Sequence, residues 1–173
     1  PAPWRQPARP HSLSLNDSVR QLSGLLRRMV PEHVTIHSEL VDDLPNIVAD
    51  PSQLDQVLLN LVANARDAMP DGGQLWIETF ATTLQHPEQL APLAPGKYAT
   101  LRVRDSGLGM TAETQERVFE PFFTTKSPTL GTGLGLATVY GIVKQHGGHI
   151  VVESEPGQGS SFSVYFPATA EPT

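Results

Sequence analysis

The chain has 173 residues, of which 39% are hydrophobic and 17% are charged, a composition typical of a globular protein with a buried core. Its net charge of −6 and the lack of any Lys/Arg run argue against nucleic-acid binding and against an anionic membrane surface as partner. The absence of cysteine excludes a thiol nucleophile, a Cys-based zinc site and disulfides, and no apolar stretch approaches the roughly 18 residues of a membrane span.

The beginning of the chain predicts a linker, a helix and two strands. Four prolines among the first ten residues disfavour regular structure, so we expect residues 1–14 to be a linker. Residues 15–30 have apolar side chains at helical spacing. Residues 34–40 alternate with a period of two and predict a strand, with residues 47–49 as its short partner.

A long helix is expected next. Asp50 at the N-cap, Pro51 at the first helical position and Gln53 at the third are typical of a helix start. Apolar residues then recur at helical spacing as far as Met69, and residues 70–73 end the helix.

The rest of the chain predicts both strands and helices. Expected elements are strands at 74–81 and 97–104, helices at about 112–119 and 133–146, and a closing hairpin of 150–152 with 162–166. Because strands and helices do not alternate strictly, we predict an α+β fold with a layer of helices on one face of a sheet. The other face would be available to a neighbouring domain.

Two asparagines in the long helix are the first candidate site. Asn60 and Asn64 are four residues apart and therefore share a helix face. Asparagine is a poor helix-interior residue, so a pair beside an apolar stripe suggests a polar function, and its carbonyl oxygen is a hard ligand that suits Mg²⁺. The alternative is a pair of solvated side chains.

The second candidate is the turn after the strand at 97–104. Asp105 ends this strand, and Gly107 and Gly109 follow it. A carboxylate can accept a hydrogen bond from the amino group of adenine, and the glycines would let the backbone approach the base. The alternative is an Asx-type turn without a ligand.

The third candidate is a glycine-rich turn that leads into a helix. Its residues are Gly131, Thr132, Gly133, Leu134, Gly135 and Leu136. The spacing is not that of a dinucleotide fingerprint, and no P-loop motif exists in the chain. Free N–H groups at a helix N-terminus can still hold phosphates, although a flexible loop would have the same composition.

The fourth candidate is a phenylalanine cluster. Phe119, Phe122 and Phe123 fall within five residues, in a chain with six phenylalanines. We expect them to anchor the mobile, Thr/Ser/Pro/Gly-rich segment 124–132. Lys126 within that segment could reach a phosphate or be a solvated lysine.

In this order and spacing, the four segments resemble the N, G1, F and G2 boxes of the catalytic domain of sensor histidine kinases. That domain belongs to the ATPase superfamily shared with DNA gyrase, the ninety-kilodalton heat-shock chaperone and MutL. The matching segments are residues 60–67, 105–109, 119–123 and 131–136, with 159–167 similar to the last strand of the family. The surrounding phrases are similar to the nitrogen-regulation subgroup.

The resemblance implies a fold and a domain organisation. The fold would be a Bergerat-type two-layer α/β sandwich, with a mixed, mainly antiparallel sheet packed against helices and an ATP lid. Residues 15–167 would form the catalytic ATP-binding domain, residues 1–14 the linker from an upstream acceptor domain, and residues 168–173 a tail.

The resemblance also implies roles for single residues. Asp105 would hold the adenine amino group between Gly107 and Gly109, Asn64 would bind Mg²⁺, and Asn60 would support the triphosphate. The third segment would shape the end of the lid and the phosphate cradle. Many kinases have a lysine where this chain has Asp67, which leaves the neighbouring Arg66 or Lys126 to supply a positive charge near the phosphates.

One position separates kinases from hydrolases in this superfamily. The hydrolases have a glutamate that activates water as a general base, and this chain has Asn60, which cannot accept a proton. The resemblance therefore implies a domain that binds Mg-ATP and donates the γ-phosphate to a histidine, in two-component signalling. The alternatives are a non-catalytic, nucleotide-gated interaction module and an ATPase.

The acceptor histidine is expected outside this chain. None of the histidines at 11, 33, 37, 86, 146 and 149 has the acidic neighbour and the following proline of a phosphoacceptor. The implied partners are an upstream dimerisation and phosphoacceptor helical bundle of the same protein and a downstream response-regulator receiver domain. We expect no nucleic acid, no direct membrane contact and a cytoplasmic location, within a parent protein that could be membrane-anchored.

Overall fold

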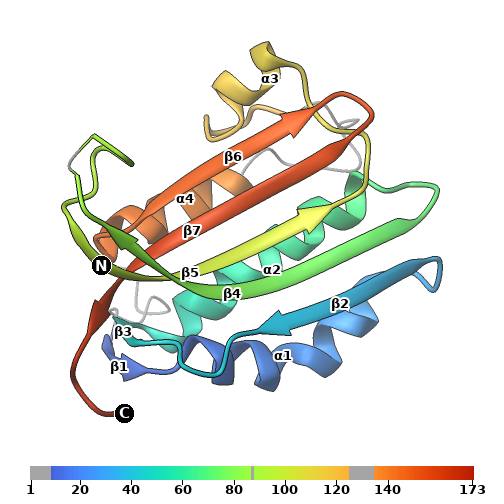
Figure 1. Cartoon of the computed structure of the whole chain (residues 1–173). Coiled ribbons are helices and arrows are strands. Elements are labelled where there is room, and N and C mark those ends of the chain that lie inside the picture. Colours follow the sequence, from blue (N-terminus) through green and yellow to red (C-terminus); the bar gives the residue numbers. More distant parts are fainter. Residues whose placement is uncertain (1–8, 87, 125–134) are drawn as a thin grey trace, which may run out of the picture.

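The computed structural model describes residues 9–86, 88–124 and 135–173. Within these residues seven strands form one sheet in the order β1-β3-β7-β5-β4-β2, and β6 also pairs with β7 (Figure 1). The strands are β1 (His11–Leu13), β2 (Val34–Leu40), β3 (Asn46–Ala49), β4 (Gly73–Leu84), β5 (Gly96–Asp105), β6 (His149–Glu155) and β7 (Gly159–Thr169). Among the described strands only the β2–β4 pair is parallel, which confirms the prediction of a mixed, mainly antiparallel sheet.

Three of the four helices in the described residues cover one face of this sheet (Figure 1). The helices are α1 (Leu15–Met29), α2 (Pro51–Asp67), α3 (Ala112–Arg117) and α4 (Gly135–Gln145), and α3 is the one that lies beside β6. No helix in the described residues is both long and apolar enough to cross a lipid bilayer. The two layers confirm the predicted α/β sandwich.

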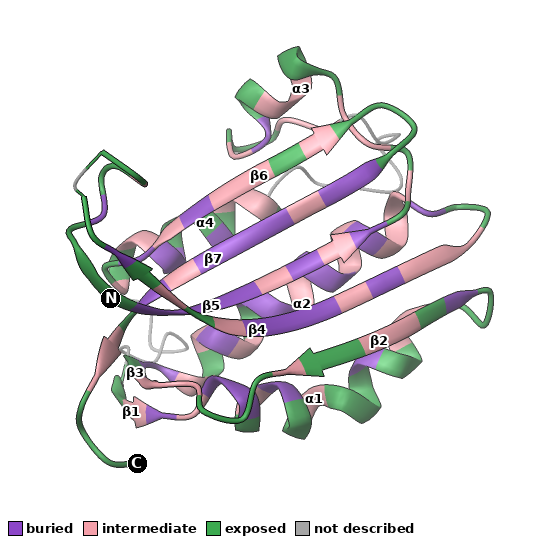
Figure 2. Ribbon diagram, viewed as in Figure 1, coloured by how far each residue is buried: buried purple, intermediate pink, exposed green. Residues whose placement is uncertain are grey.

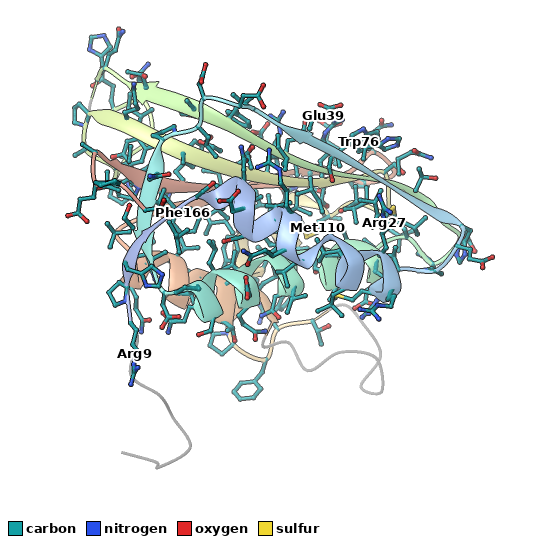
Figure 3. The ribbon with its side chains drawn as sticks, turned by 90° about the horizontal axis from the view of Figure 1, so that it is seen from below. Arg9, Arg27, Glu39, Trp76, Met110 and Phe166 are labelled. Carbon is teal, nitrogen blue, oxygen red and sulfur yellow. The ribbon has the colours of Figure 1, made fainter. Side chains whose placement is uncertain are left out.

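The hydrophobic core lies between the sheet and the helices (Figure 2). Alternate residues of the central strands point into it, as in Leu101 and Val103 of β5, and they meet Val57 and Leu61 of α2. Figure 3 shows Phe166 between the two layers, whereas Trp76 and Glu39 lie on the other face of the sheet.

The helix-free face of the sheet carries an ion-pair network. Glu78 of β4 lies 3.0 Å from Arg102 Nε and 3.5 Å from Arg104 Nε. Burial alone would raise the pKa of Glu78, but the hydrogen bonds and charges of the two arginines outweigh it and hold the pKa below its usual value. Arg104 also stacks over the ring of Trp76, 4.1 Å from its centroid.

The start of α2 forms as predicted. The Asp50 side chain accepts a hydrogen bond from the N–H of Ser52 (2.9 Å), and Pro51 occupies the first turn. Gln53 does not complete a capping box, because its buried Oε1 has no hydrogen-bond partner among the described residues.

Hydrogen bonds join α2 to α4 near the two ends of α4. The N–H of Asp50 donates to Nε2 of His146 (3.2 Å), and the His146 ring also contacts the carbonyl of Ile142 through Nδ1 (2.7 Å). At the other end, Asn60 Nδ2 donates to the carbonyl of Gly135 (3.1 Å). The two helices therefore run antiparallel and are held in a fixed axial register.

One prediction of strand pairing was wrong. Residues 47–49 were expected to pair with the strand at 34–40, but β3 pairs with β1 and β7, while β2 pairs in parallel with β4. A period of two indicates which residues share a face, but it does not identify the neighbouring strand.

The sheet also extends into both segments predicted to flank the domain. Strand β1 lies within residues 1–14, because the proline-rich stretch ends at Pro10 and residues 11–13 can pair with β3. At the other end, β7 continues to Thr169 and pairs with β3 through Ala168 and Thr169.

Candidate functional site

The candidate site begins where β5 ends, at Asp105. This side chain is only 3% exposed, and its Oδ1 accepts a hydrogen bond from the N–H of Gly107 (2.8 Å). Ser160 on β7 is the partner of Asp105 in the β5–β7 ladder. Burial raises the pKa of Asp105, and the backbone N–H groups of Gly107 and Ser160 partly offset the increase. The segment thus contains an Asx-type turn, but one that is buried and held by a second strand.

The loop after Asp105 is packed tightly between α2 and the β6–β7 hairpin. A Cβ atom on Gly107 would lie 2.2 Å from the carbonyl oxygen of Ala68, at the end of α2. Gly109 has a φ of +71°, and a Cβ there would lie 1.9 Å from the carbonyl oxygen of Glu155. Both glycines are therefore required by contacts within the protein, whatever their role toward a ligand.

Helix α2 supplies the second part of the site. Asn60 is held on both sides of its amide, because Gln56 Nε2 donates to its Oδ1 (2.6 Å) and its own Nδ2 donates to Gly135. Gln56 lies one turn earlier on the same face and was missed, although a polar residue at the same spacing of four was a usable signal.

Asn64 lies one turn closer to the glycine-containing loop. Its side chain is half-buried and makes no hydrogen bond to any residue that the structure describes. The next turn ends at Ala68, whose carbonyl accepts the N–H of Leu108 (2.9 Å). The structure therefore brings Asn64, Gly107 and the start of α4 around one helix.

Other predicted site residues have different surroundings. Arg66 Nε lies 3.1 Å from Asp67, and Nη1 donates to the carbonyl of Met29, so the guanidinium is turned toward α1 rather than Asn64. Leu136 is half-buried and packs against the hydrophobic core. The remaining candidates lie outside the described residues: Lys126, Gly131, Thr132, Gly133 and Leu134.

The phenylalanine cluster divides into packed and exposed members. Phe119 makes edge contacts with Tyr140 and Phe162 and is joined to the core. Phe122 has a φ of +67° and is 74% exposed, so the prediction that all three phenylalanines form an anchor was wrong for this residue.

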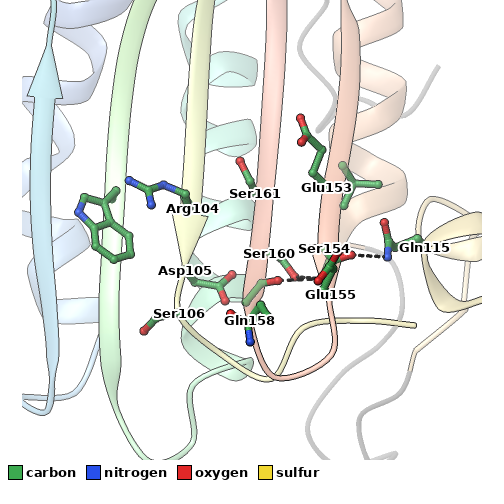
Figure 4. A pocket seen from close by; sticks show the side chains of 13 residues that line it. Arg104, Asp105, Ser106, Gln115, Glu153, Ser154, Glu155, Gln158, Ser160 and Ser161 are labelled. Carbon is green, nitrogen blue, oxygen red and sulfur yellow. Dashed lines mark hydrogen bonds between the residues drawn. The ribbon is translucent and has the colours of Figure 1, made fainter. Parts of the chain in front are cut away.

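A pocket of about 560 Å³ opens beside Asp105 (Figure 4). Its lining includes Trp76, Arg104 and Ser161 from the helix-free face of the sheet, together with the β6–β7 hairpin. Neither Asn60 nor Asn64 lines it. The pocket therefore adjoins the Asp105 loop from the side opposite to α2.

The site offers few ligands for a metal ion. Among the residues that the structure describes, no three His, Cys, Asp or Glu side chains are grouped so that they could hold one. A magnesium ion here would depend on single oxygen ligands, such as the amide of Asn64, together with phosphate oxygens and water.

The fold and these motifs define a class of ATP-binding domain. Residues 49–170 match the family described as "Histidine kinase-, DNA gyrase B-, and HSP90-like ATPase", and the chain belongs to this family. The resemblance based on the four boxes is thereby confirmed at the level of the family.

Several relatives of the chain are sensor or sporulation kinases. It is 42% identical over 169 residues to the sensor kinase CckA of Brucella abortus, and 38% identical over 135 residues to sporulation kinase E of Bacillus subtilis. These matches cover 96% and 78% of this chain but only 18% and 16% of the relatives. Its structure is similar to the catalytic domain of the histidine kinase ThkA, with a TM-score of 0.70, 28% identity, and 92% and 96% of the two chains covered.

Proposed function

We propose that this chain binds Mg-ATP and donates the γ-phosphate to a histidine on a separate helical bundle, as part of two-component signalling. The observation that carries the proposal is Asn60, on the face of α2 that contacts the first residue of α4. An amide cannot take a proton from water, so Asn60 cannot act as the general base that the hydrolases have at this position. The named relatives are kinases, which supports the same choice.

The proposed nucleotide site lies along α2, with the Asp105 loop at one end and the start of α4 at the other, and the contacts of Ala68 and Asn60 with these two segments support it. We propose that the Asp105 carboxylate accepts the adenine amino group, since it is the acceptor at the base of the loop. Asn64 would give one amide oxygen to Mg²⁺, which fits a side chain without a hydrogen bond to any described residue. Asn60 and the glycine-rich turn before α4 would support the phosphates.

The acceptor would be supplied by another segment. All six histidines lie in strands, turns or loops of the described structure, and none lies on a helix. We propose that the partner is a dimerisation and phosphoacceptor bundle of the same protein, and that a response-regulator receiver domain accepts the phosphoryl group next. In the first step an imidazole nitrogen attacks the γ-phosphorus, the bond to the β–γ bridging oxygen breaks, ADP leaves, and the imidazole releases its proton.

The test is to incubate γ-labelled ATP with the chain alone, with the bundle alone, and with both. We expect acid-labile, base-stable label on the bundle only in the mixture, at a rate that depends on bundle concentration. Transfer needs the reacting atoms within roughly 3–3.5 Å, which only docking of the two parts can provide. The matched control is a bundle in which the acceptor histidine is replaced by glutamine.

Each alternative predicts a different result in the same experiment. Rapid phosphate release by the chain alone would indicate an ATPase. Binding of ATP without transfer, even with the bundle of its own protein, would indicate a nucleotide-gated interaction module. Either result would overturn the kinase proposal.

A further inference from the structure

The hydroxyl of Ser154, on β6, occupies the centre of a hydrogen-bond network beside the Asp105 loop (Figure 4). It accepts the N–H of Met110 (2.8 Å), donates to the carbonyl of Gly159 (2.9 Å) and contacts the Ser160 hydroxyl (2.8 Å). A hydroxyl has one hydrogen and two acceptor lone pairs. With its hydrogen on Gly159, Ser154 Oγ accepts from the other two groups and has no capacity left.

These contacts fix both ends of the loop. Met110 is its last residue, and Ser154 holds it directly. At the other end, Ser160 pairs with Asp105 in the β5–β7 ladder while its hydroxyl contacts Ser154. The hairpin adds a third contact, since the N–H of Gly157 donates to the carbonyl of Leu108 at 2.7 Å.

Gln115 of α3 braces the same network from the other side. Its Nε2 donates to the carbonyl of Ser154 (2.8 Å) and to the carbonyl of Met110 (3.1 Å). Because α3 is short and its main contacts among the described strands and helices are with β6, these side-chain bonds tie it to the site.

We propose that Ser154 is a positioning residue for base recognition. It holds the loop and Ser160 so that the Asp105 carboxylate faces the adenine amino group. Gln115 supports it. The inference rests on the proposed nucleotide site, but it assigns adenine selectivity to a serine that does not itself contact the nucleotide.

The experiment compares ATP with purine riboside triphosphate, which lacks the amino group, on the wild type and on Ser154→Ala. Calorimetry should show that the substitution weakens ATP binding by about tenfold, the scale of one lost hydrogen bond. The affinity for the analogue should change much less. A general structural defect would weaken the binding of both nucleotides by the same factor. Ser154→Thr keeps the hydroxyl and should restore selectivity.

Ser161→Ala is the matched control. Ser161 lies in the same hairpin and lines the pocket, but its hydroxyl has no hydrogen bond to any described residue. If Ser154→Ala unfolds by circular dichroism, Gln115→Ala tests the same network from the half-buried surface and should lower selectivity less strongly. Unchanged selectivity in a folded Ser154→Ala, or parallel losses for both nucleotides, would overturn the inference. Failure of the wild type to bind ATP would instead overturn the nucleotide site itself.

Discussion

Replacing Asp105 by asparagine tests the proposed base recognition at its centre. One carboxylate oxygen accepts the N–H of Gly107, and the proposed site uses the carboxylate as the acceptor of the adenine amino group. Asparagine replaces one acceptor oxygen by an NH2 donor, so the adenine amino group loses its acceptor when the amide oxygen stays bonded to Gly107, at a cost of about 1–3 kcal/mol. We therefore expect ATP affinity to fall by about 5- to 150-fold. Burial raises the pKa of Asp105, which means that the charged carboxylate is unfavourable in the folded protein, and a neutral amide avoids this penalty. We therefore expect the free energy of unfolding to fall by only about 1 kcal/mol.

Calorimetry with ATP and with purine riboside triphosphate measures the affinity, and urea unfolding measures the stability. Asp105→Asn should bind the two nucleotides almost alike, whereas the wild type should prefer ATP. The control is Asp71→Asn, the same substitution at an exposed aspartate after α2. A folded Asp105→Asn with wild-type affinity, or a wild type that binds both nucleotides equally, would refute the reasoning.

Three further predictions concern metal binding, pH dependence and helix packing. Asn64→Ala should reduce the gain in nucleotide affinity that Mg²⁺ gives by about tenfold, as measured by titrations with and without Mg²⁺. The same gain in the variant as in the wild type would contradict this prediction. Glu78 has a lowered pKa, so it stabilises the fold at neutral pH, and this contribution is lost as the pH falls through the folded-state pKa. In urea unfolding, Glu78→Gln should therefore lower the free energy of unfolding by about 1 kcal/mol near pH 7 and by less near pH 3. An equal loss of stability at both pH values would argue against the pairing of Glu78 with the arginines. His146→Ala leaves the N–H of Asp50 without its partner and should lower the free energy of unfolding by about 1–3 kcal/mol, while the exposed His86→Ala should not.

Local elements could be predicted from the sequence because their signals are local. The Asp50-Pro51 start of α2 and the alternation in β2 depend on neighbours within a few residues, and both elements form where expected. The partner of β2 could not be predicted in this way, since Val34 pairs with Gly73 across a connection that contains β3 and α2. Such pairing is decided by the packing of the whole sheet.

The candidate site was predictable to a similar extent. The motifs placed Asn60 and Asp105 on the elements where the structure has them, because spacing along a helix or after a strand fixes position. Contacts between distant segments gave no local signal: the serines of the β6–β7 hairpin meet the Asp105 loop only in the folded sheet. The direction of Arg66 likewise depends on α1, which the motif does not include.

The pairing of β7 has a consequence for how this domain is made. Residues 159–169 pair with β5, with β6 and with β3, so this strand joins three parts of the sheet that have no other ladder between them in the described residues. During synthesis these three parts cannot assemble into one sheet until β7 has left the ribosome, because β7 is made after all of them. The β1–β3 pair in particular has no neighbouring strand until Ala168 is available. The domain should therefore become resistant to protease late and in a single step, once the chain has been released beyond β7.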